Sequence, residues 1–191
     1  MSRRFAAVLL VAFAFGLVVL HALDPQPIGS PLSVFSVGPY GWIYQVSFAA
    51  AALALATLAS GRTGWARGWL AIAGSGAALA AAFPSGGVAV NVSDRIHLAG
   101  SLLFVVATSS VLWFGRPSPA ARGLALSGTV LLAMTAALKV QHSSHAGLFQ
   151  RLLLAVMLVG LLRWLLADDR DRRDLASPRA ARAQRNRALR S

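Results

Sequence analysis

Apolar runs long enough to cross a membrane recur six times along this chain and restrict what it can fold into. They cover approximately residues 5–22, 42–60, 67–83, 96–114, 122–140 and 147–167, and each is bounded by arginine, proline, glycine or a polar cluster. A hydrocarbon core about 30 Å thick needs about 17 to 25 apolar residues, and in lipid such a run satisfies its backbone only as a helix. We therefore predict an all-α, polytopic bundle of six transmembrane helices.

Composition favours the same class of protein. Of the 191 residues, 57% are hydrophobic and 13% are charged, and the mean hydropathy is +0.64. That is too much apolar surface for a single soluble core. The chain contains no cysteine, which excludes disulfides, thiolate metal sites and cysteine nucleophiles.

The distribution of cations predicts the orientation. The segments that would be cytoplasmic with the N-terminus inside hold Arg3, Arg4, Arg62, Arg67, Arg116, Arg122, Arg163 and the arginines from Arg170 onward. The opposite side holds only Arg95, Lys139 and Arg151. Because lysine and arginine accumulate on the cytoplasmic side, we expect both termini to be cytoplasmic. A cleaved signal peptide is the alternative for the first run, but no convincing small-x-small cleavage site follows it.

The last segment, residues 168–191, differs abruptly from the six-helix domain at 1–167. It reads DDRDRRDLASPRAARAQRNRALRS, and we expect a disordered cytoplasmic tail. Its basic residues suit anionic lipid headgroups at about 1 kcal/mol each near the surface, and the candidates are Arg170, Arg172, Arg173, Arg179 and Arg182. No recognisable nucleic-acid-binding fold surrounds them, so we predict no nucleic-acid partner.

The third run, GWLAIAGSGAALAAAF, consists almost wholly of small residues. In lipid, glycine and alanine allow helix backbones to approach closely, so we expect this helix to pack centrally. Gly74, Gly76 and Ala78 could also line a cavity, but we favour close packing. Whether that packing is internal or between two copies, the sequence does not separate.

All four histidines fall on the predicted extracytoplasmic side. His21 ends the first run, His97 begins the fourth, and His142 and His145 lie in KVQHSSHAGLFQR, residues 139–151. The acidic residues of this side are Asp24 and Asp94. Asp94 has a plain structural alternative as the cap of the fourth helix.

Arg151 is the sharpest feature of the same side, because ionisable residues inside a span are costly and often functional. Helical spacing places Gly147, Gln150 and Arg151 on one face, which we expect to point inward with Asp24 or Asp94 as the partner of Arg151. The alternative is an arginine that extends its head outward to water.

Several of these residues together suggest a family. PLSVFSVGPYGWIYQVSFAAAALALA, then FPSGG and RIHLAG, then HAGLFQR resemble bacterial six-helix membrane proteins known only as a domain of unknown function, the nine-nine-eight family. The likeness covers roughly residues 5 to 167 and is most specific at Gly41-Trp42, Phe83-Pro84, His97 and Gly147 with Gln150-Arg151. It implies a six-helix fold in the bacterial plasma membrane but no established activity. Gly86 stands where the family usually places an aspartate.

Three functions are compatible with this pattern. The first is a binding or transport-like cavity open to the extracytoplasmic side, lined by His97, Gln45, Gln150 and Arg151 with Asp94 or Asp24 as counter-ion, for an anionic headgroup or small acid. The second is a haem held by His21 and His97, or a divalent metal chelated by His142 and His145. The third is an assembly partner, as a homo-oligomer or with another membrane protein.

Two further expectations concern chemistry. No serine or carboxylate arrangement has the supporting base and oxyanion donors of a hydrolase, so we lean against an enzyme and predict no cofactor. Histidine is the side chain that changes charge between pH 5 and 8, so several histidines on one face also make pH sensing possible.

Overall fold

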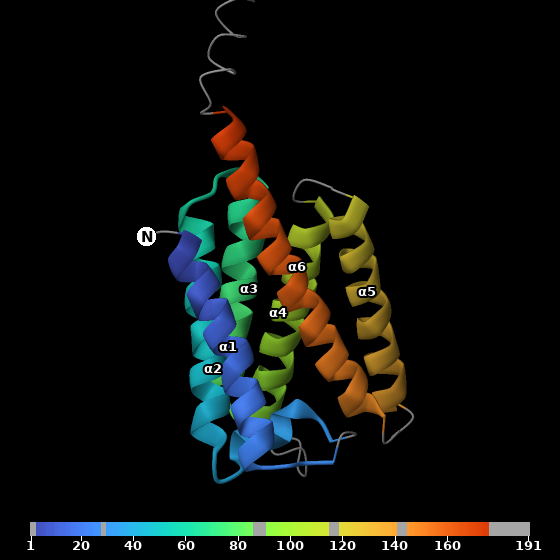
Figure 1. The fold of residues 1–191 in the computed structure, drawn as a ribbon. Coiled ribbons are helices and arrows are strands. Elements are labelled where there is room, and N and C mark those ends of the chain that lie inside the picture. Colours follow the sequence, from blue (N-terminus) through green and yellow to red (C-terminus); the bar gives the residue numbers. More distant parts are fainter. Residues whose placement is uncertain (1–2, 28–29, 86–90, 115–118, 141–144, 176–191) are drawn as a thin grey trace, which may run out of the picture.

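The computed structural model describes residues 3–27, 30–85, 91–114, 119–140 and 145–175. These residues form six α-helices and one 3-10 helix, and no strand occurs among them (Figure 1). The elements are α1 (Arg3–Leu23), η1 (Leu32–Val37), α2 (Gly41–Ser60), α3 (Gly64–Ala82), α4 (Val92–Phe114), α5 (Pro119–Val140) and α6 (Ala146–Leu175). The prediction of an all-α chain is confirmed.

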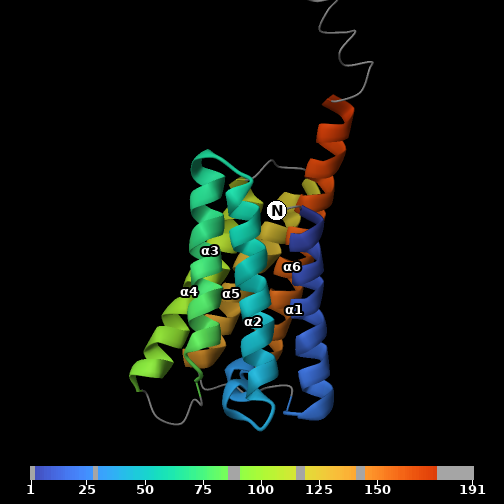
Figure 2. The same cartoon turned by 90° about the vertical axis from the view of Figure 1, so that its left-hand side faces the viewer.

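The six α-helices run along one common direction, each antiparallel to the next (Figures 1 and 2). α1, α2, α3 and α4 pack in sequence, while α6 contacts α5, α4 and α1 and so closes the bundle. Arg62, between α2 and α3, lies with its guanidinium carbon 4.4 Å from the centre of the Trp164 ring on α6. α5 lies at the edge, against α6 and α4.

Four helices in the described part of the chain are long and apolar enough to cross a membrane: α1, α2, α4 and residues 147–166 of α6. The helical content and these four helices indicate a membrane protein. α3 and α5 are not among them, so the count of six spans and the orientation stay predictions. α6 continues to Leu175, past the predicted start of the tail at residue 168, with no proline or glycine to end it.

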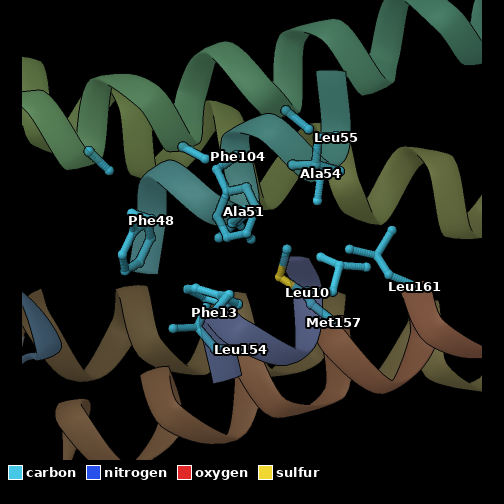
Figure 3. Packing of buried hydrophobic residues seen from close by; sticks show 14 of the residues in the cluster. Leu10, Phe13, Phe48, Ala51, Ala54, Leu55, Phe104, Leu154, Met157 and Leu161 are labelled. Atoms are coloured by element: carbon cyan, nitrogen blue, oxygen red, sulfur yellow. The ribbon is translucent and has the colours of Figure 1, made fainter. Parts of the chain in front are cut away.

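The buried core lies between α1, α2, α3, α4 and α6, and Figure 3 shows the part between α1, α2, α4 and α6. Phe13 of α1 meets Phe48 of α2 edge to face, with ring centres 5.2 Å apart, and Phe48 stacks on Tyr44 at 4.5 Å. Met157 and Leu161 of α6 complete the cluster. Aromatic pairs of this geometry add about 0.5 to 1.5 kcal/mol beyond their buried area.

α3 packs closely on α4 through glycine, as the small-residue run predicts. A Cβ on Gly76 would lie 2.5 Å from the backbone nitrogen of Phe104, and one on Gly100 would lie 2.7 Å from Cβ of Leu79. No larger side chain fits either position without moving a helix. At the start of α3, Gly64 has φ 62°, a conformation that glycine adopts without strain.

Candidate functional site

One end of the bundle, which we call the capped end, is covered by η1 and the residues on either side of it. It lies at the bottom of Figure 1, where α1 ends and α2 and α6 begin. The polar side chains that hold the covering segments in place come from α1, η1, α4 and α6. The opposite end, where α1 begins and α6 ends, is called the tail end below.

Arg151 of α6 contacts both α1 and the segment that follows it. Its Nε lies 2.8 Å from Nε2 of His21, and its Nη1 donates to the carbonyl of Ser30 at 2.8 Å. The side chain is half-buried. The prediction that Arg151 faces inward is confirmed, and its contacts with His21 and Ser30 were not predicted.

The protonation state of His21 follows from its two neighbours. Nδ1 lies 2.8 Å from the carbonyl oxygen of Leu17, which can only accept a hydrogen bond, so Nδ1 carries the proton. Nε2 then carries a free lone pair, which accepts a hydrogen bond from the Nε–H of Arg151. The ring also packs on Phe35 of η1, with centres 4.6 Å apart. His21 is therefore neutral in this arrangement.

Gln150 holds the same segment one residue before Arg151. Its Oε1 accepts the backbone N–H of Leu32 at 3.0 Å. Leu32 is the first residue of η1, where the N–H has no partner inside its own helix. We call these five residues, His21, Ser30, Leu32, Gln150 and Arg151, the latch.

A second group of contacts fixes η1 to the end of α3. Ser36 is buried, and its hydroxyl donates to the carbonyl of Ser33 at 2.7 Å and accepts the N–H of Ser85 at 2.9 Å. The hydroxyl of Ser93 donates to the carbonyl of Pro84 at 2.7 Å. A Cβ on Gly41 would lie 2.5 Å from the carbonyl oxygen of Ser36, so α2 starts directly against η1. The capped end is thus pinned at two places.

His97 belongs to this second group and not to the latch. It is buried, and its Nδ1 lies 2.8 Å from the carbonyl of Phe83, with the Tyr44 ring centre 6.1 Å away. Gln45 lines an open groove between α2 and α3. The structure therefore brings Gln150 and Arg151 together and places His97 and Gln45 on other elements.

The two carboxylates predicted as counter-ions have local roles. Asp94 and Asn91 cap the start of α4 reciprocally: Asp94 Oδ2 accepts from the Asn91 N–H at 3.1 Å, and the Asp94 N–H donates to Asn91 Oδ1 at 2.9 Å. This is the structural alternative that the sequence offered. Asp24 accepts a hydrogen bond from Gln26 at 2.8 Å.

Metal or haem binding by the histidines stays a hypothesis. Within the described ranges, no group of three or more histidine, cysteine, aspartate or glutamate side chains lies close enough to hold a metal ion. His142 lies outside the described residues, and His145 is exposed. Both ring nitrogens of His21 already have partners, so a metal there would have to displace Leu17 or Arg151.

Of the predicted lipid-binding arginines, Arg170, Arg172 and Arg173 lie on the continuation of α6, while Arg179 and Arg182 lie outside the described residues. Fold and site together define an all-helical bundle of membrane type with a latched covering segment at one end. Comparison with protein-family models, with curated proteins and with solved structures finds no match to this chain.

Proposed function

We propose that this chain is a six-span protein of the bacterial plasma membrane that responds to protons on the extracytoplasmic side by opening the latch. The observation that carries the proposal is the 2.8 Å contact from Arg151 Nε to His21 Nε2. With both termini cytoplasmic, as the arginine distribution predicts, the capped end faces outward. The response needs no catalytic residue.

The latch can close only while Nε2 of His21 is unprotonated. Protonation would turn Nε2 into a donor that faces the donor Nε–H of Arg151, and it would place two positive charges side by side. A hydrogen bond to a charged group contributes about 1.5 to 3 kcal/mol, and this contribution is lost on protonation. The bond from Nδ1 to Leu17 survives in either state.

The sign of the pH dependence follows directly. The closed latch needs an unprotonated Nε2, so it is stable at high pH and loses its hydrogen bond when falling pH puts a proton on that nitrogen. The charged and titratable groups described near His21 are Arg151 on α6 and Asp24 just after α1; η1 contributes Phe35. In the closed latch, Oδ1 of Asp24 accepts a hydrogen bond from Gln26.

A distance measurement between two spin labels tests the response. The chain has no cysteine, so Val37→Cys on η1 and Leu152→Cys on α6 place nitroxides at two exposed positions. In lipid nanodiscs we expect one narrow distance distribution at pH 8 and a broader, longer one at pH 5. His21→Gln keeps an acceptor for Arg151 but cannot titrate, so it should stay narrow at both pH values.

Two further variants separate the latch from general acid effects. Arg151→Ala should give the broad distribution at both pH values, because the donor is gone. His145→Gln alters an exposed histidine of the same end and should leave the pH response intact. If the unsubstituted label pair gives the same distribution at pH 8 and pH 5, the proposal is wrong.

A further inference from the structure

Arg151 closes the latch through two neutral acceptors. Its Nε lies 2.8 Å from Nε2 of His21, and its Nη1 donates to the carbonyl oxygen of Ser30 at 2.8 Å. His21 keeps its one ring proton on Nδ1, so neither acceptor carries a negative charge. A carboxylate, phosphate or sulfate group is a stronger partner for a guanidinium, because it adds charge attraction and accepts two parallel hydrogen bonds. The latch therefore holds Arg151 with weaker acceptors than an oxyanion would offer.

The contact with His21 also covers the edge of Arg151 that binds oxyanions. In a guanidinium, the Nε–H and one Nη–H lie side by side and match the spacing of two oxygens on a carboxylate or phosphate. With the imidazole against Nε, an oxyanion cannot reach that edge. Neutral His21 is therefore an internal group that blocks an anion site.

Protonation of His21 turns the blocking group into a second donor. A proton on Nε2 removes the acceptor for Arg151 and places the imidazolium and guanidinium charges next to each other. An oxyanion between the two side chains accepts hydrogen bonds from both and offsets their repulsion. Nδ1 still donates to the carbonyl of Leu17 at 2.8 Å, so the ring keeps its orientation on α1.

We propose that the latch is a proton-gated oxyanion site, in which protonated His21 and the uncovered edge of Arg151 together bind a carboxylate, phosphate or sulfate group. The inference rests on the proposed pH response and adds the ligand that the open latch binds. The coupling is reciprocal: an anion that binds only the open latch favours opening by as much as opening strengthens anion binding. Acid and oxyanion therefore shift the latch in the same direction.

The depth of the site allows two sources for the oxyanion. Arg151 is the sixth residue of α6 and is half-buried, so it lies about 8 Å along the helix from its start at 1.5 Å per residue. With the capped end facing outward, this depth is close to the outer lipid headgroups and to the extracytoplasmic solution. A lipid phosphate and a dissolved oxyanion offer the same oxygen atoms to the latch.

The charged groups described around His21 include one competitor for the oxyanion. Of the elements packed against His21, α6 contributes Arg151 at this end, while η1 and α2 contain no charged residue. The titratable residue of α2 is Tyr44, which stacks on Phe48. Asp24 follows His21 by three residues. Once the latch opens, this carboxylate is the internal group that would compete for Arg151.

The spin-labelled pair Val37→Cys with Leu152→Cys measures the coupling as a change in population. The protein is placed in maltoside micelles, which carry no oxyanion, in sodium chloride at the pH where half of the molecules give the long distance. Sodium sulfate then replaces chloride at equal ionic strength, so that screening stays constant. At ten times its dissociation constant, sulfate multiplies the ratio of open to closed latch by about 11 and raises the open fraction from half to about nine tenths.

The sign and the source of the effect are both measurable. Sulfate that acted only as an excluded salt would favour the compact, closed latch, so the expected effect has the opposite sign. A second set of samples uses nanodiscs that contain phosphatidylglycerol, at their own half-open pH in chloride. An effect of sulfate in micelles and nanodiscs identifies a dissolved oxyanion as the ligand, whereas an effect in micelles alone shows that a lipid phosphate already occupies the site.

Three variants locate the effect. In His21→Gln, which cannot titrate, the distance distribution should stay narrow in sulfate. Arg95→Gln removes an exposed arginine of the capped end and should leave the sulfate effect unchanged; loss of the effect there would place the anion at Arg95 and overturn the proposal. A sulfate effect seen only in Asp24→Asn would show that Asp24 takes Arg151 in the open latch, and it would overturn the proposal too.

The failure of the oxyanion site differs from the failure of the pH response. If sulfate leaves the open fraction in micelles unchanged, the oxyanion site is refuted and the pH response stands. If the label pair gives one distribution at pH 8 and pH 5 in chloride, the pH response is refuted, and the oxyanion site with it.

Discussion

Replacing Gly76 with alanine should wedge α3 away from α4. The added Cβ would lie 2.5 Å from the Phe104 nitrogen and 2.6 Å from the Gly100 oxygen, both backbone atoms that cannot rotate away. Relief requires the helices to separate by roughly 1 Å, and a gap of that size forfeits about a quarter to a half of each affected dispersion contact. We expect a loss of about 1 to 3 kcal/mol of stability, typical of overpacking.

For a chain of this size that loss lowers Tm by about 2 to 12 °C, which thermal unfolding in detergent measures. Gly68→Ala on the same helix is the matched control, since nothing lies within 4 Å of a Cβ there. It should be neutral or stabilise by up to about 1 kcal/mol, because alanine has the higher helix propensity. A Gly76→Ala variant as stable as Gly68→Ala would refute the close approach of α3 and α4.

Three other substitutions have defined outcomes. Arg151→Ala removes the donors to His21 and Ser30 and should speed proteolysis between α1 and α2 at pH 8, whereas the exposed Arg163→Ala should not; equal cleavage would count against the latch. Ser36→Ala strands the buried Ser85 N–H and should cost about 1 to 3 kcal/mol in thermal unfolding, and a change below about 0.5 kcal/mol would contradict that role. Thr108→Val should raise Tm, because the buried Thr108 hydroxyl makes no hydrogen bond in the described part of the chain; a lower Tm would show that it has a partner.

Helices were predictable from the sequence because their signal is local. Each apolar run coincides with a helix of the structure. The largest difference is at the end of α6, which continues to Leu175, past the predicted end at residue 167, because nothing local stops the helix there. The close packing of α3 was also predictable, since a helix made almost wholly of small residues allows close backbone approach. A glycine-rich helix face predicts a close helix–helix contact in lipid but does not indicate which helix is the partner.

The candidate site was predictable only in part. Helical spacing indicates that Gln150 and Arg151 share an inward face. It does not indicate their partners, which are His21 at the end of α1, the carbonyl of Ser30 and the N–H of Leu32 in η1. Every residue carries the same backbone carbonyl and N–H groups, so the sequence does not show which of them bind a side chain. An arginine, by contrast, suggests a carboxylate as its partner. Asp24 and Asp94 were therefore the natural choices, although Asp94 caps its own helix.

The location of His97 shows the same limit. Its place at the start of α4 was evident, but its distance from the latch depends on how α3 and α4 meet at Phe83. Those contacts join residues that are separated along the chain, and their geometry depends on the loops between the helices. A single sequence gives no measure of such geometry.

The central claim is that His21 closes the latch as a neutral imidazole with its proton on Nδ1. Nitrogen NMR of selectively labelled histidine measures this directly, and with four histidines in the chain the His21 signal can be assigned by comparison with His21→Gln. We predict a protonated Nδ1 and a bare Nε2 at pH 8, with Nε2 gaining its proton over the same pH range in which the spin-label distance broadens. A proton on Nε2 while the latch is closed would contradict the account.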